Sequence, residues 1–226
     1  MALNKQKTDP ELGKKVEDHL KGLGLQTPTT VFNDEDPEDQ KAKLTDIFKE
    51  ALQNLGLDLQ DDSLRDTPRR IAKMYIDEIF YGLKINNFPK ITTIENKMKY
   101  DELLVERDIN TQSNCEHHFV VIDGKTHIGY IPNEKVIGLS KLNRIVEYFA
   151  KRPQVQERLT AQIHATLCLL LETEDVAVVI DGVHFCVKSR GIEDTSSSTS
   201  TSKMSGRFRS NSDLRNEFLN RISAPR

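Results

Sequence analysis

Two short segments about seventy residues apart share the chain's most chemically distinctive side chains. The first is Cys115-Glu116-His117-His118 and the second is His184-Phe185-Cys186. Two thiolates and one imidazole suit a tetrahedral Zn²⁺ and leave its fourth position open for water, as in catalytic zinc sites. A site of this kind requires the fold to bring both segments together. The chain is therefore expected to be a zinc hydrolase.

We assign the metal to Cys115, His118 and Cys186, because Cys115 and His118 are three residues apart, a usual separation for two ligands in a turn. His117 and His184 are then available to transfer protons. Strand alternation predicts that residues 183–190 are extended, with His184, Cys186 and Arg190 on one face. His184 would then lie beside the zinc water rather than on the metal.

The cysteines and histidines are also compatible with roles that need no catalytic metal. Buried cysteines often behave as small hydrophobic side chains, which is the expectation for Cys168. A disulfide between Cys115 and Cys186 is disfavoured in a reducing compartment. A structural zinc site would need a fourth protein ligand, and none is evident. His127 is expected at the surface and His164 at an ordinary helix position, both without a role in the site.

Composition narrows the class of protein. The 226 residues are 37% hydrophobic and 30% charged, and the formal net charge of −3 argues against a nucleic-acid protein with a broad basic face. The N-terminus lacks the apolar stretch of a secretion signal, and no apolar run reaches the roughly 20 residues that cross a bilayer. Three cysteines, an odd number, fit a reducing compartment. We expect a cytoplasmic protein that binds neither membrane nor nucleic acid.

The first 90 residues read as a helical region, and residues 91–226 as a catalytic domain. Caps and apolar periodicity predict helices from Asp9-Pro10 to Gly24, around Leu44 to Leu55, and from Thr67-Pro68 to Gly82. Residues 26–39, which are rich in acidic side chains, are expected to be a solvated linker.

The second region combines strands with two helices. Asp123-Gly124 and Asp181-Gly182 predict two tight hairpin turns, because Asp-Gly readily adopts the positive φ angles that such turns need. Between them, helices are expected over about 139–151 and 154–172, with a final helix over about 212–222 and a loop or edge segment over 195–202. This order predicts an α+β domain with two helices on one face of an antiparallel sheet.

A helix start at Gly138 offers a second binding element. Its first turns carry Ser140, Lys141 and Arg144, and free N–H groups at a helix N-terminus favour anions. Cations are poorly placed there for helix stability, which indicates a bound phosphate, although a solvated basic face is the alternative. Glu157 could accept two hydrogen bonds from an amidine-like edge, for example the N1–H and 2-amino group of guanine. Ordinary charge placement at a helix start accounts for Glu157 equally well.

Taken together, these segments closely resemble the zinc-dependent GTP cyclohydrolase I family. The resemblance begins at about residue 44 and rests on five stretches with specific order and spacing: Thr67 to Tyr75, Ser113 to Phe119, Tyr130 to Lys141, Arg152 to Thr160, and Val183 to Gly191. It implies the tunnelling fold, in which subunit sheets join into a barrel. It also implies a homodecamer with active sites at subunit interfaces.

The resemblance implies conversion of GTP and water into 7,8-dihydroneopterin triphosphate and formate, the first step towards tetrahydrofolate and other pterins, and so a place in one-carbon metabolism. It implies one Zn²⁺ per subunit on Cys115, His118 and Cys186. The implied substrate contacts are Gln156 and Glu157 for guanine and Ser140, Lys141, Arg144 and Arg190 for the triphosphate. The alternatives are a zinc nucleobase deaminase, whose H-x-E and P-C-x-x-C signatures are missing, and a non-catalytic pterin- or nucleotide-binding member of the fold.

Overall fold

A computed structural model of the chain describes residues 5–29 and 35–225. Residues 30–34 of the expected acidic linker lie outside the described residues. The N-terminal third is helical as expected, and its elements are η1 (Lys5–Lys7), α1 (Pro10–Gly22), α2 (Pro37–Asn54), α3 (Thr67–Lys73), the π-helical turn η2 (Met74–Ile79), η3 (Tyr81–Leu83) and η4 (Ile85–Asn87).

Local sequence explains where the first two helices begin. The Asp9 side chain accepts a hydrogen bond from the N–H of Leu12 at 3.0 Å, and Pro10 occupies the first turn of α1. Asp36 and Pro37 repeat the arrangement at α2. The acidic linker is therefore shorter than expected, because its last residues form the first turn of α2.

The remaining chain builds a five-stranded sheet with the order β5-β2-β3-β6-β7. All neighbours are antiparallel except β5, which runs parallel to β2. A separate two-stranded sheet joins β1 and β4. The bounds are β1 (Thr93–Glu95), β2 (Leu104–Cys115), β3 (Val121–Tyr130), β4 (Lys135–Ile137), α4 (Leu139–Ala150), β5 (Pro153–Gln154), α5 (Gln156–Leu171), β6 (Val176–His184), α6 (Phe185–Lys188), β7 (Thr199–Met204), α7 (Arg207–Ser210) and α8 (Ser212–Ser223).

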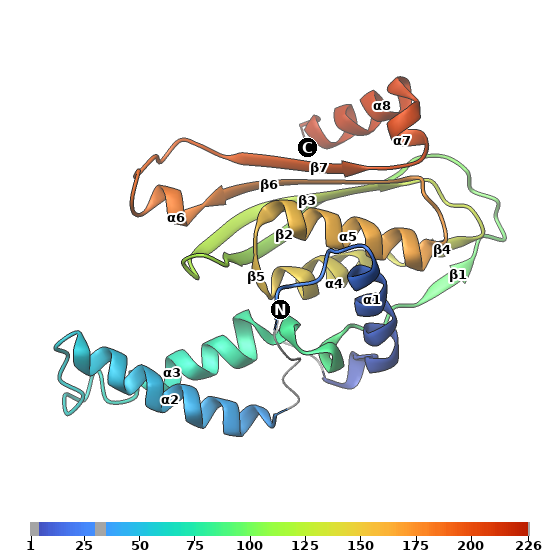
Figure 1. Cartoon of the computed structure of the whole chain (residues 1–226). Helices are drawn as coiled ribbons and strands as arrows, with labels where there is room; N and C mark the ends of the chain where they lie inside the picture. The colour runs from blue at the N-terminus through green and yellow to red at the C-terminus, as the bar shows by residue number, and fades with distance from the viewer. Residues whose placement is uncertain (1–4, 30–34, 226) are drawn as a thin grey trace.

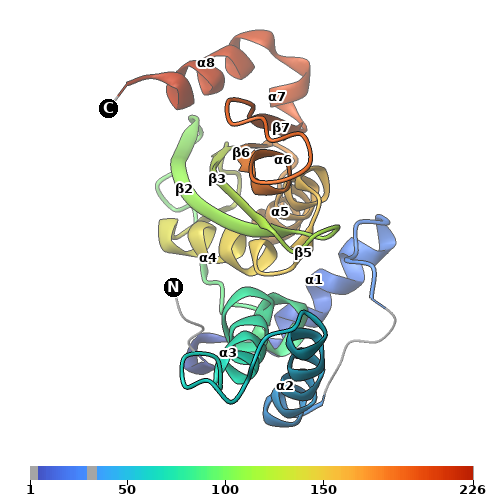
Figure 2. The same ribbon diagram turned by 90° about the vertical axis from the view of Figure 1, so that its left-hand side faces the viewer.

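Helices α4 and α5 cover one face of the sheet and α8 lies on the other (Figures 1 and 2). Alternation along β6 explains both layers, because Val178 and Ile180 pack into the core beneath α4 and α5 while Ala177 and Val179 pack with Phe218 of α8. The expected α+β architecture with two helices on one face is confirmed. It matches the arrangement that the tunnelling fold has within one subunit.

The two Asp-Gly pairs are not hairpin turns. Both lie inside strands, where Gly124 of β3 is paired with Gly182 of β6. A Cβ on Gly124 would lie 2.3 Å from the carbonyl oxygen of Asp181, and one on Gly182 would lie 2.7 Å from Oε1 of Gln156. The glycines are needed for close approach of neighbouring atoms rather than for positive φ. The true β2–β3 connection is residues 116–120, and the β6–β7 connection is residues 185–198.

The helices of the N-terminal region pack in two different ways. Val16 and Leu20 of α1 are fully buried and belong to the same core as the sheet and α5. Helices α2 and α3 instead pair with each other and project from the body (Figure 1). The domain boundary at about residue 90 stays a prediction. Among the described helices, none combines the length and the apolar character that crossing a membrane requires.

Candidate metal centre

The Cys-Glu-His-His segment forms the turn between β2 and β3. Strand β2 ends at Cys115, whose N–H donates to Val120 O at 2.8 Å, while the N–H of Phe119 donates to Cys115 O at 2.8 Å. Phe119 adopts a φ of 53°, in the left-handed region. This compact turn places the first cluster at one end of the sheet, which we call the metal end: residues 115–118, 156–157 and 184–190.

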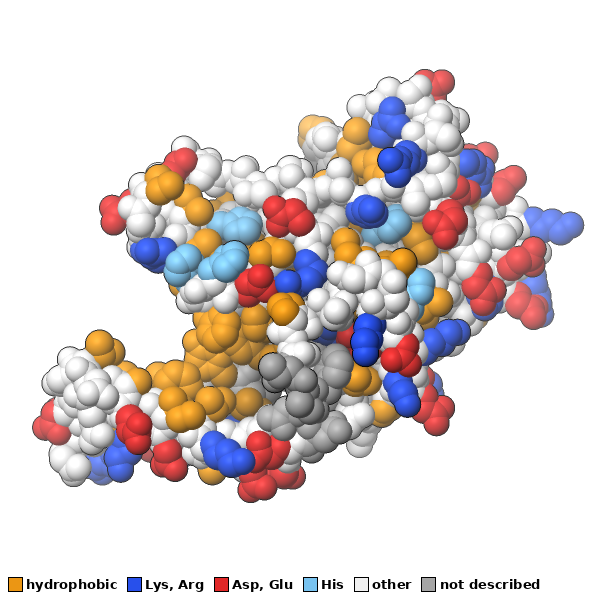
Figure 3. Space-filling view, in the orientation of Figure 1, with side chains coloured by type: hydrophobic (Ala, Val, Ile, Leu, Met, Phe, Trp, Pro, Cys, Tyr) orange, Lys and Arg blue, Asp and Glu red, His pale blue; other side chains and the backbone are white. Residues whose placement is uncertain are grey.

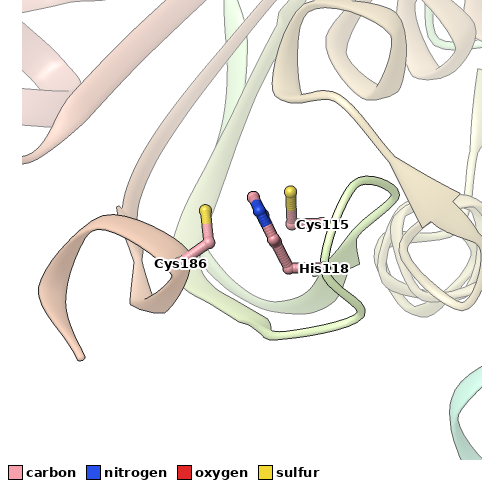
Figure 4. Close-up of side chains that lie close together, drawn as sticks. All are labelled: Cys115, His118 and Cys186. Atoms are coloured by element: carbon pink, nitrogen blue, oxygen red, sulfur yellow. The ribbon is translucent and has the colours of Figure 1, made fainter. Parts of the chain in front are cut away.

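Cys115, His118 and Cys186 meet at the metal end. Their candidate ligand atoms all lie within 4.8 Å of one another, and Figure 4 shows the three side chains pointing toward a common centre. In a tetrahedral zinc site, ligand atoms are about 3.5–4 Å apart, given Zn–S and Zn–N bonds of about 2.3 and 2.0 Å. Two sulfurs and one imidazole nitrogen at this separation fit a zinc ion with one open position. The three residues assigned as ligands are therefore brought together.

The route that brings Cys186 there differs from the prediction. Strand β6 ends at His184, and residues 185–188 form the single helical turn α6. The expectation of an extended strand to Arg190 was wrong because β3 provides its last partner at Ile122, opposite His184. Beyond that pair the strand has no neighbour on that side to continue the ladder. Cys186 reaches the cluster from a helical turn rather than by strand alternation.

The two expected proton-transfer histidines occupy different surroundings. The His117 side chain is exposed, with Nδ1 3.6 Å from Cys115 Sγ and Nε2 3.9 Å from Glu116. His184 is half-buried, and its Nε2 lies 2.8 Å from Oε1 of Gln156. Burial lowers the pKa of His184, and the Glu157 carboxylate offsets part of that shift. Figure 3 shows histidine side chains gathered on this end of the body, above a hollow with a largely hydrophobic wall.

Gln156 has partners that the sequence did not reveal. Its amide nitrogen donates to the carbonyl oxygens of Ile180 and Thr199, both at 2.9 Å, and lies 3.1 Å from Thr201 Oγ1. The side chain is buried, so it holds His184 and the sheet edge rather than facing solvent. Guanine contact by this side chain stays a prediction. Glu157, the next residue, is exposed at the start of α5 and is free of this network.

Arg190 also lies at the metal end, where Nη1 is 2.9 Å from His118 Nε2. It is exposed, so its guanidinium is available to an anion that approaches the cluster. Cys186 is the less buried of the two thiols. Burial, together with the neighbouring Cys115, raises the pKa of Cys186 above its ordinary value, and a bound cation would reverse that effect by favouring the thiolate.

Ser140, Lys141 and Arg144 lie at the opposite end, which we call the phosphate end. They occupy the first turns of α4, where Asn143 contacts Glu106 near the start of β2 at 3.4 Å. Cys115 is nine residues further along β2, or roughly 30 Å at 3.3 Å per residue. The far end of α4 leads into β5, which pairs with Cys115. One chain therefore does not bring Ser140, Lys141 and Arg144 to its own metal cluster, whereas Arg190 lies beside that cluster.

Several cations lie close together at the phosphate end. Partial burial lowers the pKa of Lys141, and so do the nearby charges of Arg144, Lys7 and Lys90. Four positive groups around one helix start favour an anion. Sequence reasoning missed Lys7 and Lys90, whose charges act on Lys141. A backbone hydrogen bond from Lys90 N to Lys7 O at 2.9 Å holds these two residues next to each other.

Sequence reasoning also missed the ion pair of Arg158 with Glu116. Glu116 lies between two predicted site residues, and Arg158 fixes the turn from α5. The two positions are 42 residues apart, so no local pattern could reveal their contact.

Comparison with known proteins gives consistent matches. The model of the GTP cyclohydrolase I family matches residues 44–223. A protein named GTP cyclohydrolase 1 from Shewanella sp. (strain ANA-3) is 57% identical over 212 residues, covering 93% of this chain and 97% of its own length. Proteins of the same name from Yersinia enterocolitica and Salmonella arizonae are each 56% identical, covering 92% and 94% of this chain and 94% and 98% of their own lengths. A solved structure, archaeosine synthase QueF-Like in the apo form, aligns with 15% identity and a TM-score of 0.37 over 46% of this chain and 93% of its own, too weakly to argue from.

Proposed function

The chain belongs to the GTP cyclohydrolase I family, and we propose that its active site joins the metal end of one subunit to the phosphate end of another. Its activity is hydrolysis of GTP at guanine C8, followed by rearrangement to 7,8-dihydroneopterin triphosphate with release of formate. The observation that carries the catalytic part of the proposal is the convergence of Cys115, His118 and Cys186, with His184 two residues before Cys186.

We infer that these three residues hold one Zn²⁺ per subunit, since two thiols and an imidazole match its preferred donors. When bound, the ion would supply Lewis-acid activation of the water that hydrolysis requires. Two thiolates offset most of the metal's charge, so a protein base is also needed. His117 and His184 are the candidates.

The hydrogen bonds of Gln156 indicate which nitrogen of His184 carries the proton. The Gln156 amide nitrogen faces two carbonyl oxygens, which fixes the amide orientation and leaves Oε1 toward His184. An amide oxygen only accepts, so Nε2 of neutral His184 carries the hydrogen and Nδ1 holds the free lone pair. His184 is then set to accept a proton at Nδ1. His117, exposed on the turn, is the second group for moving a proton to or from the guanine ring.

We assign the triphosphate to Ser140, Lys141 and Arg144 of a neighbouring subunit, together with Arg190 at the metal end. Within one chain the two sets lie at opposite ends of a nine-residue stretch of β2, whose extended length of roughly 30 Å is longer than a nucleoside triphosphate needs to span. A homo-oligomer solves this, and a decamer with sites at its interfaces is the assembly that the family resemblance implies. Glu157, exposed at the metal end, is the proposed partner of the guanine edge.

We also place this enzyme in the cytoplasm, where thiol ligands stay reduced, and at the entry to tetrahydrofolate and pterin synthesis. All three cysteines are free in the structure, which is compatible with that compartment.

The test is to incubate zinc-loaded protein with GTP and to measure formate together with the fluorescent pterin formed after oxidation. Both products are expected in equal amounts. A fully metallated protein that releases neither would disprove the catalytic proposal and favour a non-catalytic nucleotide-binding member of the fold. His117→Ala serves as the matched variant, because it should keep zinc while turnover falls by about 10²–10⁴-fold. Loss of zinc in His117→Ala would overturn the ligand assignment.

A further inference from the structure

A buried ion pair connects the N-terminal helix to the body of the protein. Glu17 of α1 pairs with Arg152, which follows α4, and both side chains are almost completely buried, with exposed fractions of 4% and 0%. The Arg152 guanidinium also stacks on the rings of Tyr148 and Phe149, at 4.6 and 4.9 Å from their centroids. Its Nη1 donates to Thr27 Oγ1 at 3.3 Å.

This ion pair lacks some of the hydrogen bonds that a purely stabilising buried pair would make. Among the residues that the structure describes, Glu17 Oε2 and Arg152 Nε have no hydrogen-bond partner. Buried ion pairs of this kind are often no more stable than apolar residues of the same size, because removing the charges from water costs several kcal/mol. The role of the pair is better understood from the backbone that it positions.

Arg152 lies next to β5, the strand that supports the metal-ligand turn. Pro153 and Gln154 pair in parallel with Asn114 and Cys115. The N–H of Glu116 donates to Gln154 O at 3.0 Å, and the Ser113 hydroxyl lies 3.4 Å from the carbonyl oxygen of Arg152 itself. The backbone position of Cys115 therefore depends on where residues 152–154 are held.

A second branch reaches the same strand through side-chain amides. The Leu25 carbonyl accepts from Gln162 Nε2 at 2.7 Å, and Gln162 Oε1 accepts from Gln154 Nε2 at 2.8 Å. Gln154 Oε1 in turn accepts from Arg158 Nε at 3.1 Å, and Arg158 pairs with Glu116. Gln154 and Gln162 are fully buried, so the bond between them is shielded from competing water, and the links on either side of it are partly buried.

We propose that residues 17–27 act as a support for the zinc site, with Glu17, Arg152 and Gln154 as positioning residues for Cys115 and the turn that carries His118. The two branches form one buried polar relay from α1 to β5. None of these side chains is among the metal ligands or substrate contacts assigned above. The inference rests on the proposed zinc site, and it assigns a role to a part of the chain that lies outside the segment matched by the family model.

The test compares Glu17→Gln with Asp18→Asn in the full chain. Both remove one carboxylate charge from α1, but Asp18 is exposed and Glu17 is buried. Two quantities are measured: Co²⁺ affinity, with the sulfur-to-cobalt charge-transfer band as the signature of thiolate ligation, and amide hydrogen exchange of residues 113–118 in metal-free protein. We expect Glu17→Gln to lose about tenfold in Co²⁺ affinity and to exchange faster at residues 113–118. Asp18→Asn should match the unsubstituted protein in both.

Thr27→Val is the milder variant if Glu17→Gln does not fold. It removes the hydroxyl that accepts from Arg152 with little change in shape, and the same two shifts are expected at smaller size. Unchanged affinity and unchanged exchange in a folded variant would overturn the support role while leaving the zinc site intact. If the unsubstituted protein itself binds no Co²⁺, the zinc proposal fails, whereas the exchange comparison still decides whether the relay holds the turn.

Discussion

The two ends of the sheet are built differently, although one substrate is proposed to use both. At the metal end, the important side chains are held by hydrogen bonds: His184 by Gln156, and Glu116 by Arg158. At the phosphate end, Lys141 and Arg144 lie among like charges that lower the pKa of Lys141. At the metal end, contacts within the chain therefore fix the orientation of these side chains. The phosphate end instead has repulsion among its cations that an anion would relieve.

The two ends should therefore respond differently to substitution. Bond making and proton transfer need side chains fixed to within a fraction of an ångström, so loss of one ligand should abolish the chemistry. Charge attraction is spread over several cations, so loss of one should weaken binding in a graded way.

The largest effect is expected for Cys186→Ala. With two protein ligands left, zinc affinity should fall sharply and turnover should drop by at least about 10³-fold. Zinc content by mass spectrometry and formate release are the measurements. Cys168→Ala is the matched control, since burial raises the pKa of that thiol to about 11 and it lies away from the cluster near His164 and Ser205. Full zinc occupancy in Cys186→Ala would contradict the expectation that the metal end, unlike the phosphate end, fails when one side chain is lost.

The sequence predicted most of the metal end because its chemistry is local. Cys115, His118 and Cys186 stand out by residue type, and the cap at Asp9 marks where α1 begins. The bounds of α1, α4, α5 and α8 came within a few residues, whereas α2 begins at Pro37, seven residues before its expected start, and α3 ends at Lys73, where the π-helical turn η2 replaces the expected helix to Gly82. Side-chain identity and near-neighbour spacing carry both kinds of information.

What the sequence could not predict depends on strand pairing. Asp-Gly is read as a turn from its own residues, yet Gly124 and Gly182 face each other across two strands beneath Gln156. The turn after His184 likewise follows from the end of the β3 partner strand. His127 was expected at the surface but is buried, where its Nδ1 accepts from the backbone N–H of Asp108 at the β2 bulge at 3.2 Å. The roughly 30 Å between the two ends becomes visible only once the topology is known.

An intermediate effect is expected for Lys141→Ala. Loss of one charged hydrogen bond to phosphate is worth about 1.5–3 kcal/mol, so KM for GTP should rise about 10- to 150-fold while zinc content stays unchanged. Steady-state kinetics and metal analysis together check this. Loss of zinc in this variant would contradict the separation of the two ends.

Mixing the two impaired variants tests whether the ends come from different subunits. After Cys186→Ala and Lys141→Ala protein are unfolded together and refolded, a site is intact only when its metal end comes from a Lys141→Ala subunit and its phosphate end from a Cys186→Ala subunit. Random assembly makes about one quarter of the sites intact. Recovery of about a quarter of the original activity at low GTP is therefore expected. Activity no higher than the average of the separate variants would show that each chain completes its own site.

The smallest effect concerns acid stability and a buried histidine in the middle of α5. His164 is buried with Nε2 2.9 Å from the Ser205 hydroxyl and with Cys168 beside it, and burial, aided by the charge of Lys203, lowers its pKa to about 4. An unfolded histidine has a pKa of about 6.5, so between about pH 6.5 and 4 the unfolded chain binds more protons and stability falls as pH decreases. The loss of stability attributable to His164 should be at most about 3 kcal/mol and should vanish above about pH 7.

Urea unfolding of the metal-free protein at pH 7 and pH 5 measures this loss, and His164→Gln should reduce the difference in stability between the two pH values. Because burial also lowers the pKa of His127 and His184, some acid sensitivity will remain in the variant; an unchanged difference would mean that His164 is not the buried group that titrates.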